Sequence, residues 1–172
     1  MKQLLFLFVL IISSCSSERP NNYRKLDLSN KRLTSIPDSV LNMIDLDTLD
    51  LGSDFTLYPP LSAIIDSNAN QISLLSEEIG NLTNLKALIL RGNKLTALPY
   101  SISKMDKLEY IDLSFNTEFD IVKEIDKIKK LPKLKKLNIA FVSATQSDID
   151  IIKHTLPNTQ VIFSIQEFLD TL

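Results

Sequence analysis

A leucine pattern that recurs about every 23 residues constrains this chain more than any other feature. It is clearest from Leu85 to Leu95, where the letters read L-K-A-L-I-L-R-G-N-K-L, and it continues with Leu98-Pro99 and Ile102. A fixed period of this length indicates one structural unit that is stacked several times. Because stacked units form extended surfaces, the pattern favours a binding protein over an enzyme.

The repeated unit contains a short stretch in which apolar and other residues alternate, as they do in a β-strand. Aligning the second apolar residue of each motif predicts strands at Leu26, Leu49, Ile65, Leu88, Ile111 and Leu137, with steps of 23, 16, 23, 23 and 26 residues. Ile65-Asp66-Ser67 is the weakest match, and the Gly52-Ser53-Asp54 turn is one residue short. The 16-residue step also contains Tyr58-Pro59-Pro60, so we expect an irregular loop between 51 and 65.

The motif L-x-x-L-x-L-x-x-N-x-L, followed by L-P-x-x-I, resembles the leucine-rich-repeat family over residues 23–163. The resemblance implies an α/β solenoid with about six short parallel strands on its concave face, and short helices and turns on its convex face. It also implies that Asn70, Asn93 and Asn116 point inward as a ladder that bonds the backbone of each turn. Lys31 and Val142 stand where that ladder would have asparagine.

The last third of the chain predicts helices and a cap. Apolar residues at helical spacing predict a convex-side helix over 120–131, and a second helix is expected over 147–154 with Ser147 or Asp148 near its cap. We expect a last strand over 161–163. Residues 164–172 would then close the core, with a short helix over 166–172, because terminal repeats need an atypical cap.

The N-terminus predicts export. Leu4 to Ile12 is an apolar run of nine residues, which is too short to span a bilayer and is typical of a signal peptide. Ile12-Ser13-Ser14-Cys15 resembles a bacterial lipobox. The resemblance implies that residues 1–14 are removed, that Cys15 carries diacylglycerol, and that 15–22 form a tether. The alternative is an ordinary signal peptide with an incidental cysteine.

We therefore expect an exported lipoprotein that is anchored to a bacterial membrane. Stable anchoring requires two or more acyl chains. Ser16 replaces the aspartate of an inner-membrane retention signal, which favours the outer membrane or the cell surface.

No catalytic, metal or cofactor motif is present in the sequence, so we expect no enzyme and no cofactor apart from the lipid on Cys15. His154 is the single histidine, and Asp148 and Asp150 nearby do not complete a metal site. A formal net charge of −2 also argues against nucleic acid as a partner.

The outward residues of the strands should form a protein-binding surface. Aromatic, arginine and apolar residues are typical of binding hot spots. The candidate partner-binding residues are Ile89, Arg91, Tyr110, Asp112, Phe115 and Phe141. Two structural alternatives stay open: that the aspartate row belongs to the repeat itself, and that the two phenylalanines pack on each other.

Charge is divided unevenly along the chain. Residues 33–85 contain eight acidic residues and no Lys or Arg, whereas residues 121–136 contain seven lysines. A solvated helix face explains such lysines, and contact with anionic lipid or glycan is the alternative. The sequence thus predicts a lipid-anchored module that binds a protein partner, with binding of an envelope glycan or polymer, or adhesion, as the alternative function.

Overall fold

The computed structural model describes residues 24–58, 62–65, 67–164 and 166–167; over 55–58 and 62–65 it describes the backbone. The predicted signal peptide, residues 1–14, and the predicted tether, 15–22, lie outside the described residues. Of the predicted closing helix, Gln166 and Glu167 are described, and both are helical. The Ser164 hydroxyl accepts a hydrogen bond from Glu167 N at 3.1 Å, and the Glu167 carboxylate accepts one from Ser164 N at 3.3 Å. This reciprocal pair is a capping box, which marks the start of a helix.

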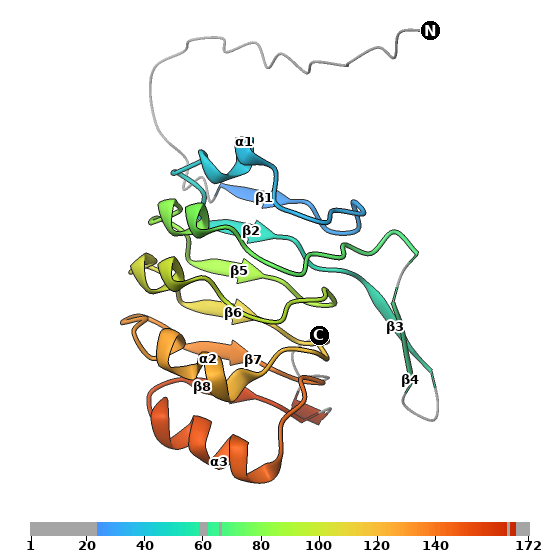
Figure 1. Ribbon diagram of the computed structural model, residues 1–172, viewed down its shortest axis with the longest axis vertical. Coiled ribbons are helices and arrows are strands. Elements are labelled where there is room, and N and C mark those ends of the chain that lie inside the picture. The colour runs from blue at the N-terminus through green and yellow to red at the C-terminus, as the bar shows by residue number, and fades with distance from the viewer. Residues whose placement is uncertain (1–23, 59–61, 66, 165, 168–172) are drawn as a thin grey trace, which may run out of the picture.

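Six short strands form one parallel sheet (Figure 1). In spatial order they are β1 (Lys25–Asp27), β2 (Thr48–Asp50), β5 (Ala87–Ile89), β6 (Tyr110–Asp112), β7 (Lys136–Asn138) and β8 (Gln160–Ile162). Their middle residues align in one register, so that Leu49 faces Leu88 and Leu88 faces Ile111. The predicted sheet of about six parallel strands is confirmed.

The helices lie together on the other side of the solenoid (Figure 1). They are α1 (Asp38–Leu41), the 3₁₀ helices η1 (Glu77–Asn81) and η2 (Tyr100–Lys104), α2 (Ile121–Ile128) and α3 (Gln146–Thr155). Asp120 caps α2 by accepting a hydrogen bond from Lys123 N, and Thr145 with Asp148 forms a capping box at the start of α3. Both helices predicted in this part of the chain are present, although α2 is shorter than the predicted 120–131 and α3 begins one residue earlier than predicted.

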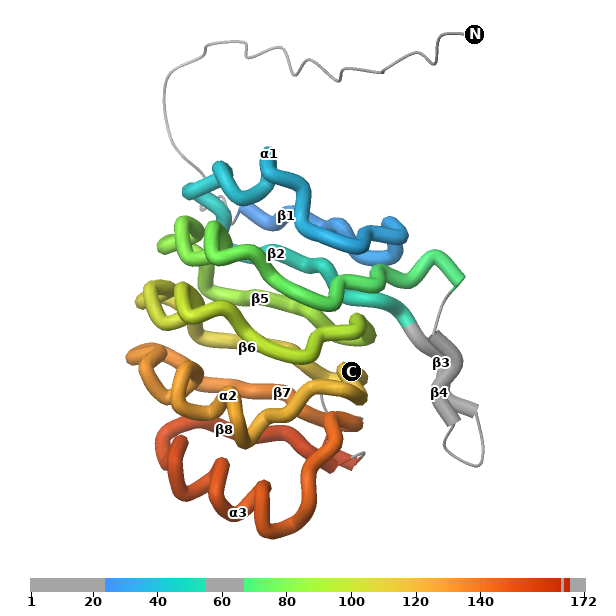
Figure 2. Tube along the Cα trace, in the orientation of Figure 1, coloured from blue at the N-terminus to red at the C-terminus, as the bar shows by residue number. Residues whose placement is uncertain are grey.

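The core lies between these two layers, and the turns of the chain stack in sequence order (Figure 2). The middle strand residues Leu49, Leu88, Ile111 and Leu137 have no exposed surface. Each such side chain contributes about 1.5–3 kcal/mol when it is fully buried. Because the leucines of neighbouring repeats form one continuous cluster, stability depends on stacking rather than on any single repeat.

The prediction of a solenoid strand at Ile65 is wrong. β2 pairs directly with β5, and Ile65 belongs to an antiparallel hairpin of β3 (Phe55–Tyr58) and β4 (Ser62–Ile65). The irregular loop expected over this stretch is therefore a hairpin. Asp66, which follows Ile65 in this motif, lies outside the described residues.

The hairpin belongs to a 16-residue insertion, residues 54–69, within an ordinary repeat. The 39-residue step from Leu49 to Leu88 is the usual 23 residues enlarged by these 16. Ser53 and Asn70 meet across the insertion, where Asn70 N donates to Ser53 Oγ at 2.9 Å. The turn predicted to be one residue short is thus completed by Asn70.

Candidate concave interface

Three buried asparagines hold the turns that follow the strands. In Asn116, Oδ1 accepts from Leu95 N at 2.9 Å, while Nδ2 donates to the carbonyls of Leu90 at 3.0 Å and Leu113 at 2.8 Å. Asn93 makes the equivalent bonds to Ile72 N and to the carbonyls of Leu51 and Leu90. Each amide therefore joins its own turn to the preceding repeat and satisfies backbone groups that water cannot reach.

Asn70 takes the same place in the repeat that carries the insertion. Its Oδ1 accepts from Lys31 N at 3.0 Å and Leu33 N at 2.9 Å, and its Nδ2 donates to the carbonyls of Leu28 and Leu51. The first repeat, which has Lys31 in place of asparagine, is thus held by the amide of its neighbour. This ladder fixes the strand ends and so the spacing of the concave rows.

A row of Asp and Asn side chains on the concave face also has a structural task. In β1, β2, β6 and β7, the row residue accepts a hydrogen bond from the backbone N–H two residues later; these residues are Asp27, Asp50, Asp112 and Asn138. Short polar side chains commonly bond nearby backbone in this way. The aspartate row therefore belongs to the repeat itself.

Ile89 of β5 stands in this row where those four strands carry Asp or Asn. Its side chain is partly exposed and lies between Asp50 and Asp112 in the strand register. Beside it, a Cβ added to Gly52 would lie 3.1 Å from Asp50 Oδ1 and 3.2 Å from Ile89 Cγ2. Glycine therefore lets an apolar and an acidic side chain converge at the centre of the face.

Arg91 and Asp50 supply charge around Ile89. The Arg91 guanidinium lies 3.8 Å from the carboxylate of Asp54, and Nε donates to Ser53 O at 3.4 Å. Burial raises the pKa of the Asp50 carboxyl above its ordinary value of 3.8, and the nearby charge of Asp27 adds to the rise. Lys25 lies 4.0 Å from Asp50 and opposes it. Acidic, basic and apolar groups thus meet within two neighbouring repeats.

Tyr110 borders the same surface on β6. Its hydroxyl donates to Asp112 Oδ2 at 3.0 Å, and the Lys136 ammonium lies 5.4 Å from the centre of its ring. Burial raises the pKa of the Tyr110 hydroxyl, and the charge of Asp112 raises it further. Tyr110 is partly exposed, so part of its side chain remains accessible on this face.

Two of the candidate residues are buried in the structure. Asp112 is 2% exposed because its carboxylate accepts from Tyr110, from Ser114 N at 3.0 Å and from Ser114 Oγ at 2.6 Å. Phe115 is 5% exposed and packs with Ala140 and Ile162. Neither can act as an exposed anchor, so the prediction fails for these two side chains.

Phe115 and Phe141 also occupy a different row from Arg91. Both have positive φ, 58° and 61°, and correspond to Gly92, whose φ is 66°. Left-handed backbone is strained for a bulky residue and is held here by the repeat geometry. The two rings stack at 4.1 Å, so they pack on each other as the structural alternative expected. Phe141 remains partly exposed.

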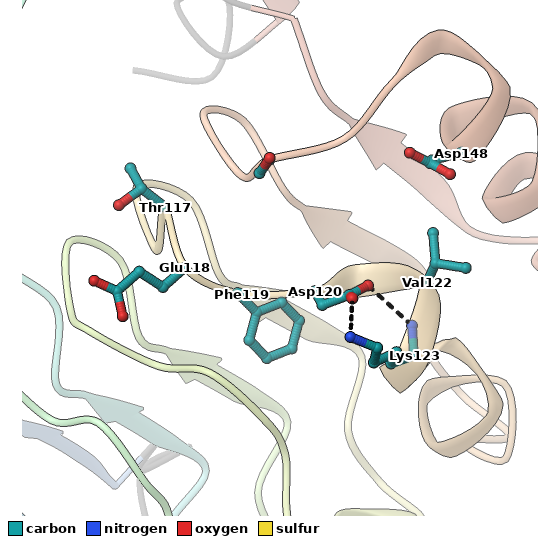
Figure 3. A pocket seen from close by; sticks show the side chains of 8 residues that line it. Thr117, Glu118, Phe119, Asp120, Val122, Lys123 and Asp148 are labelled. Carbon is teal, nitrogen blue, oxygen red and sulfur yellow. Dashed lines mark hydrogen bonds and ion pairs between the residues drawn. The ribbon is translucent and has the colours of Figure 1, made fainter.

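The convex side carries an open pocket of about 570 Å³ near the start of α2 (Figure 3). Asp120 and Asp148 line it, but their carboxylates serve as helix caps, and Asp120 also pairs with Lys123 at 2.7 Å. His154 lies exposed in the last turn of α3. Within the described residues, no group of three or more His, Cys, Asp or Glu could hold a metal ion. Two of the carboxylates that line this pocket are therefore engaged in capping helices.

Several lysines of residues 121–136 are engaged within the fold. Lys127 pairs with Glu124 at 2.7 Å and donates to Leu98 O at 2.6 Å, and Lys135 pairs with Glu109 at 2.7 Å.

Among the residues that the structure describes, no helix is long and apolar enough to cross a membrane.

Comparison with known proteins supports the fold. A solved leucine-rich-repeat protein of Leptospira interrogans aligns over 81% of this chain and 37% of its own, with a TM-score of 0.58 and 26% identity. The adenylate cyclase of Schizosaccharomyces pombe is 35% identical over 104 residues, which are 56% of this chain. Rat leucine-rich repeat-containing protein 66 is 31% identical over 117 residues, which are 67% of this chain. No family model matches.

The chain has the leucine-rich-repeat solenoid fold. The Leptospira structure shares this fold over most of the chain. The matches cover 6% of the cyclase and 13% of the rat protein. A share of that size does not carry the activity of the cyclase to this chain.

Proposed function

We propose that this chain is a lipid-anchored protein of a bacterial envelope that binds a protein partner with its concave face. The supporting observation is Ile89, a partly exposed apolar residue in a row where four other strands carry Asp or Asn. The polar residues of that row bond the backbone, a task that isoleucine cannot perform. An apolar side chain at such a site fits recognition better than it fits the repeat.

The surface around Ile89 has the composition of an interface centre. Arg91 and the ring of Tyr110 flank it, and Asp50 adds a partly desolvated carboxylate. Aromatic and arginine side chains dominate binding hot spots, where truncation costs about 2–4 kcal/mol. The partner would place an apolar group on Ile89 and Tyr110 and a basic group near Asp50.

Site-specific crosslinking tests this surface in the native cell. Benzoylphenylalanine at position 89 should give an adduct with the partner after irradiation. The matched control is position 100, because Tyr100 is 75% exposed and lies on η2, on the helical side of the solenoid. Equal adducts at both positions, or none at position 89, would exclude the concave face.

The anchor is a separate part of the proposal. Cys15→Ser should abolish labelling by radioactive palmitate and move the protein from the membrane fraction into the soluble fraction. The control is Ser16→Ala, which leaves the cysteine in place and should label normally. Labelling that persists in Cys15→Ser would disprove the anchor without affecting the concave site.

A further inference from the structure

The first repeat leaves the apolar core open at the N-terminal end of the stack. Leu26 and Leu28 are partly exposed, whereas Leu49 and Leu51, which take the same places in the next repeat, have no exposed surface. Each repeat buries its apolar side chains against both neighbours. The first repeat therefore lacks the cover that a preceding repeat would give it.

Met43 shows the same opening on the helical side. It takes the place of Leu82 and Met105, since the N–H of each donates to the carbonyl of the residue three positions earlier. Leu82 and Met105 have no exposed surface, but Met43 is 43% exposed. The open apolar end thus extends from β1 to the turn that follows α1.

β1 is also an open edge of the sheet. Among the strands that the structure describes, β1 pairs with β2 alone and stands at the end of the stack (Figure 1). In the bonds to β2, Leu28 N donates at 2.7 Å and Arg24 O accepts at 3.2 Å. Because the backbone groups of alternate residues point to the same side of a strand, those of Lys25 and Asp27 point away from β2. Edge groups of this kind readily pair with another strand.

The sequence of β1 is complementary to itself. In an antiparallel pair of two β1 strands, residues whose backbone groups point outward must face each other. One such register sets Lys25 opposite Asp27 of the second copy on both sides of a twofold axis, with Leu26 opposite itself. Each pair then exchanges both backbone hydrogen bonds and brings opposite charges together. The registers shifted by two residues set Lys25 or Asp27 opposite itself, so charge selects the first register.

The charges of β1 are accessible for this pairing. The side chains of Lys25 and Asp27 are each 53% exposed, and their charged groups lie 3.7 Å apart. Lys25 also lies 4.0 Å from Asp50, and Ser29 Oγ donates to Asp27 Oδ1 at 2.7 Å. Ion pairs at such exposed sites are weak and leave room for a further partner. A second copy would therefore add to these contacts without first breaking a buried pair.

The chain before β1 offers little apolar cover of its own. Residues 16–23 read S-S-E-R-P-N-N-Y, with Tyr23 as their single large apolar side chain. This step rests on the proposed processing at Cys15, which removes the apolar run of the signal peptide. A second copy of the chain, by contrast, brings both an open apolar end and a complementary strand.

We propose that two copies of this chain pair through antiparallel β1 strands, so that their sheets join and their open cores cover each other. The same patch of both copies forms the interface, and the twofold axis closes the assembly. That axis runs perpendicular to the sheet, so both concave faces lie on one side of the joined sheet. The pairing goes beyond the function proposed for the concave rows and leaves those of β5 and β6 exposed.

Co-recovery of two differently tagged copies from native membranes measures the pairing. Lys25→Asp gives a β1 strand with acidic residues at both outward positions, and Asp27→Lys gives one with basic residues at both. In two copies of either variant, the register sets like charges opposite each other. Co-recovery should therefore fall at least about tenfold below that of the parent chain.

The mixed pair is the decisive combination. Lys25→Asp expressed together with Asp27→Lys restores opposite charges across the axis, although neither chain regains its own contact between residues 25 and 27. Co-recovery should return to within about threefold of the parent chain. Equal recovery in all combinations, or a mixed pair that does not exceed either variant alone, would overturn the proposal.

Two further variants locate the apolar part of the interface. Met43→Asp should lower co-recovery about tenfold, because it places a charge in the open end of the core. Ile151→Asp is the matched control, since Ile151 is 46% exposed on α3 at the other end of the stack, and it should leave co-recovery unchanged. Equal losses in both variants would contradict the assigned surface.

Other outcomes identify another cover for this end. A monomeric parent chain whose β1 amides are protected from hydrogen exchange would assign the open edge to the chain's own N-terminal segment and overturn the proposal. Tyr110→Ala should leave co-recovery unchanged. Palmitate labelling tests the anchor, Tyr110→Ala tests the concave face and the mixed pair tests β1, so the three proposals fail independently.

Discussion

Single side chains carry the contacts between repeats, and Asn116 is the most fully enclosed of the ladder residues. Asn116→Ala would leave Leu95 N and the carbonyls of Leu90 and Leu113 without their side-chain partner. Unpaired buried polar groups cost about 1–3 kcal/mol each, so we expect a loss of about 3 kcal/mol in the free energy of unfolding. Urea denaturation measures it. Asn158→Ala, at an exposed turn, is the control and should change stability by less than about 0.5 kcal/mol.

Two neighbouring aspartates of the concave row should respond oppositely to pH. Burial raises the pKa of Asp50 above 3.8, so the folded state binds more protons than the unfolded state in the window just above 3.8. Its contribution to stability is therefore lost as pH rises through that window. The change in the free energy of unfolding caused by Asp50→Asn should therefore be more favourable to the folded state at about pH 7 than at about pH 2.5.

Asp27 provides the matched comparison. Hydrogen bonds from Ser29 lower the pKa of Asp27 below 3.8, so its stabilisation is present above 3.8 and is lost as pH falls through the folded value. The change in the free energy of unfolding caused by Asp27→Asn should therefore be less favourable to the folded state at about pH 7 than at about pH 2.5. Denaturation of both variants at the two pH values measures this, and pH effects of the same sign would contradict the assignment.

The sequence predicted the asparagine ladder but not the conformation of Phe115 and Phe141. The ladder follows from spacing, because a short amide recurs in phase with the leucines. The phenylalanines correspond to Gly92, and no propensity rule places a bulky residue in left-handed backbone. Phe115 aligns with Gly92 rather than with Arg91, so its ring is packed within the fold and is not an exposed anchor.

At the scale of elements, a partly buried ion pair joins α2 to the preceding repeat. Glu124 accepts from Leu98 N at 2.9 Å and from Lys127 at 2.7 Å, and Lys127 donates to Leu98 O. Glu124→Ala would leave the partly buried ammonium and Leu98 N without this carboxylate. We expect a loss of about 3 kcal/mol in the free energy of unfolding, measured by urea denaturation.

Asp126→Ala on the same helix is the control. Its side chain is 78% exposed and pairs with Lys129 at 2.9 Å on the surface. Surface pairs contribute little, so the change should stay below about 1 kcal/mol. Similar losses in both variants would contradict the role given to the contact between Glu124 and Leu98, because alanine has the highest helix propensity and cannot itself cause such a loss.

The hairpin shows why one element escaped sequence reasoning. Ile65 precedes Asn70 by five residues, as Leu88 precedes Asn93, so the end of the insertion imitates a repeat. Only the pairing of β2 with β5 reveals that Asn70 completes the turn begun at Leu51. Helices α2 and α3 were predictable because each combines apolar spacing with a capping residue at its start.

At the scale of the whole molecule, stacking turns local repeats into one continuous surface. The six strands align in register, so that Asp50 and Ile89 share one row and Tyr110 stands two residues away in the row of Ala87. The fold was predictable because the same apolar spacing recurs in several repeats, so that no single residue decides the assignment. The interface was less so, since it depends on which side chains the rows leave exposed.

Quantitative co-purification tests the central claim, that the concave face binds a protein partner. Tagged parent chain, Tyr110→Ala and Tyr100→Ala are recovered from native membranes, and bound proteins are counted by mass spectrometry. Tyr110 lies on the sheet, whereas Tyr100 is exposed on η2. If the concave face binds the partner, one protein is recovered equally with the parent chain and Tyr100→Ala but at least about tenfold less with folded Tyr110→Ala. Equal recovery with all three chains, or a loss confined to Tyr100→Ala, would contradict it.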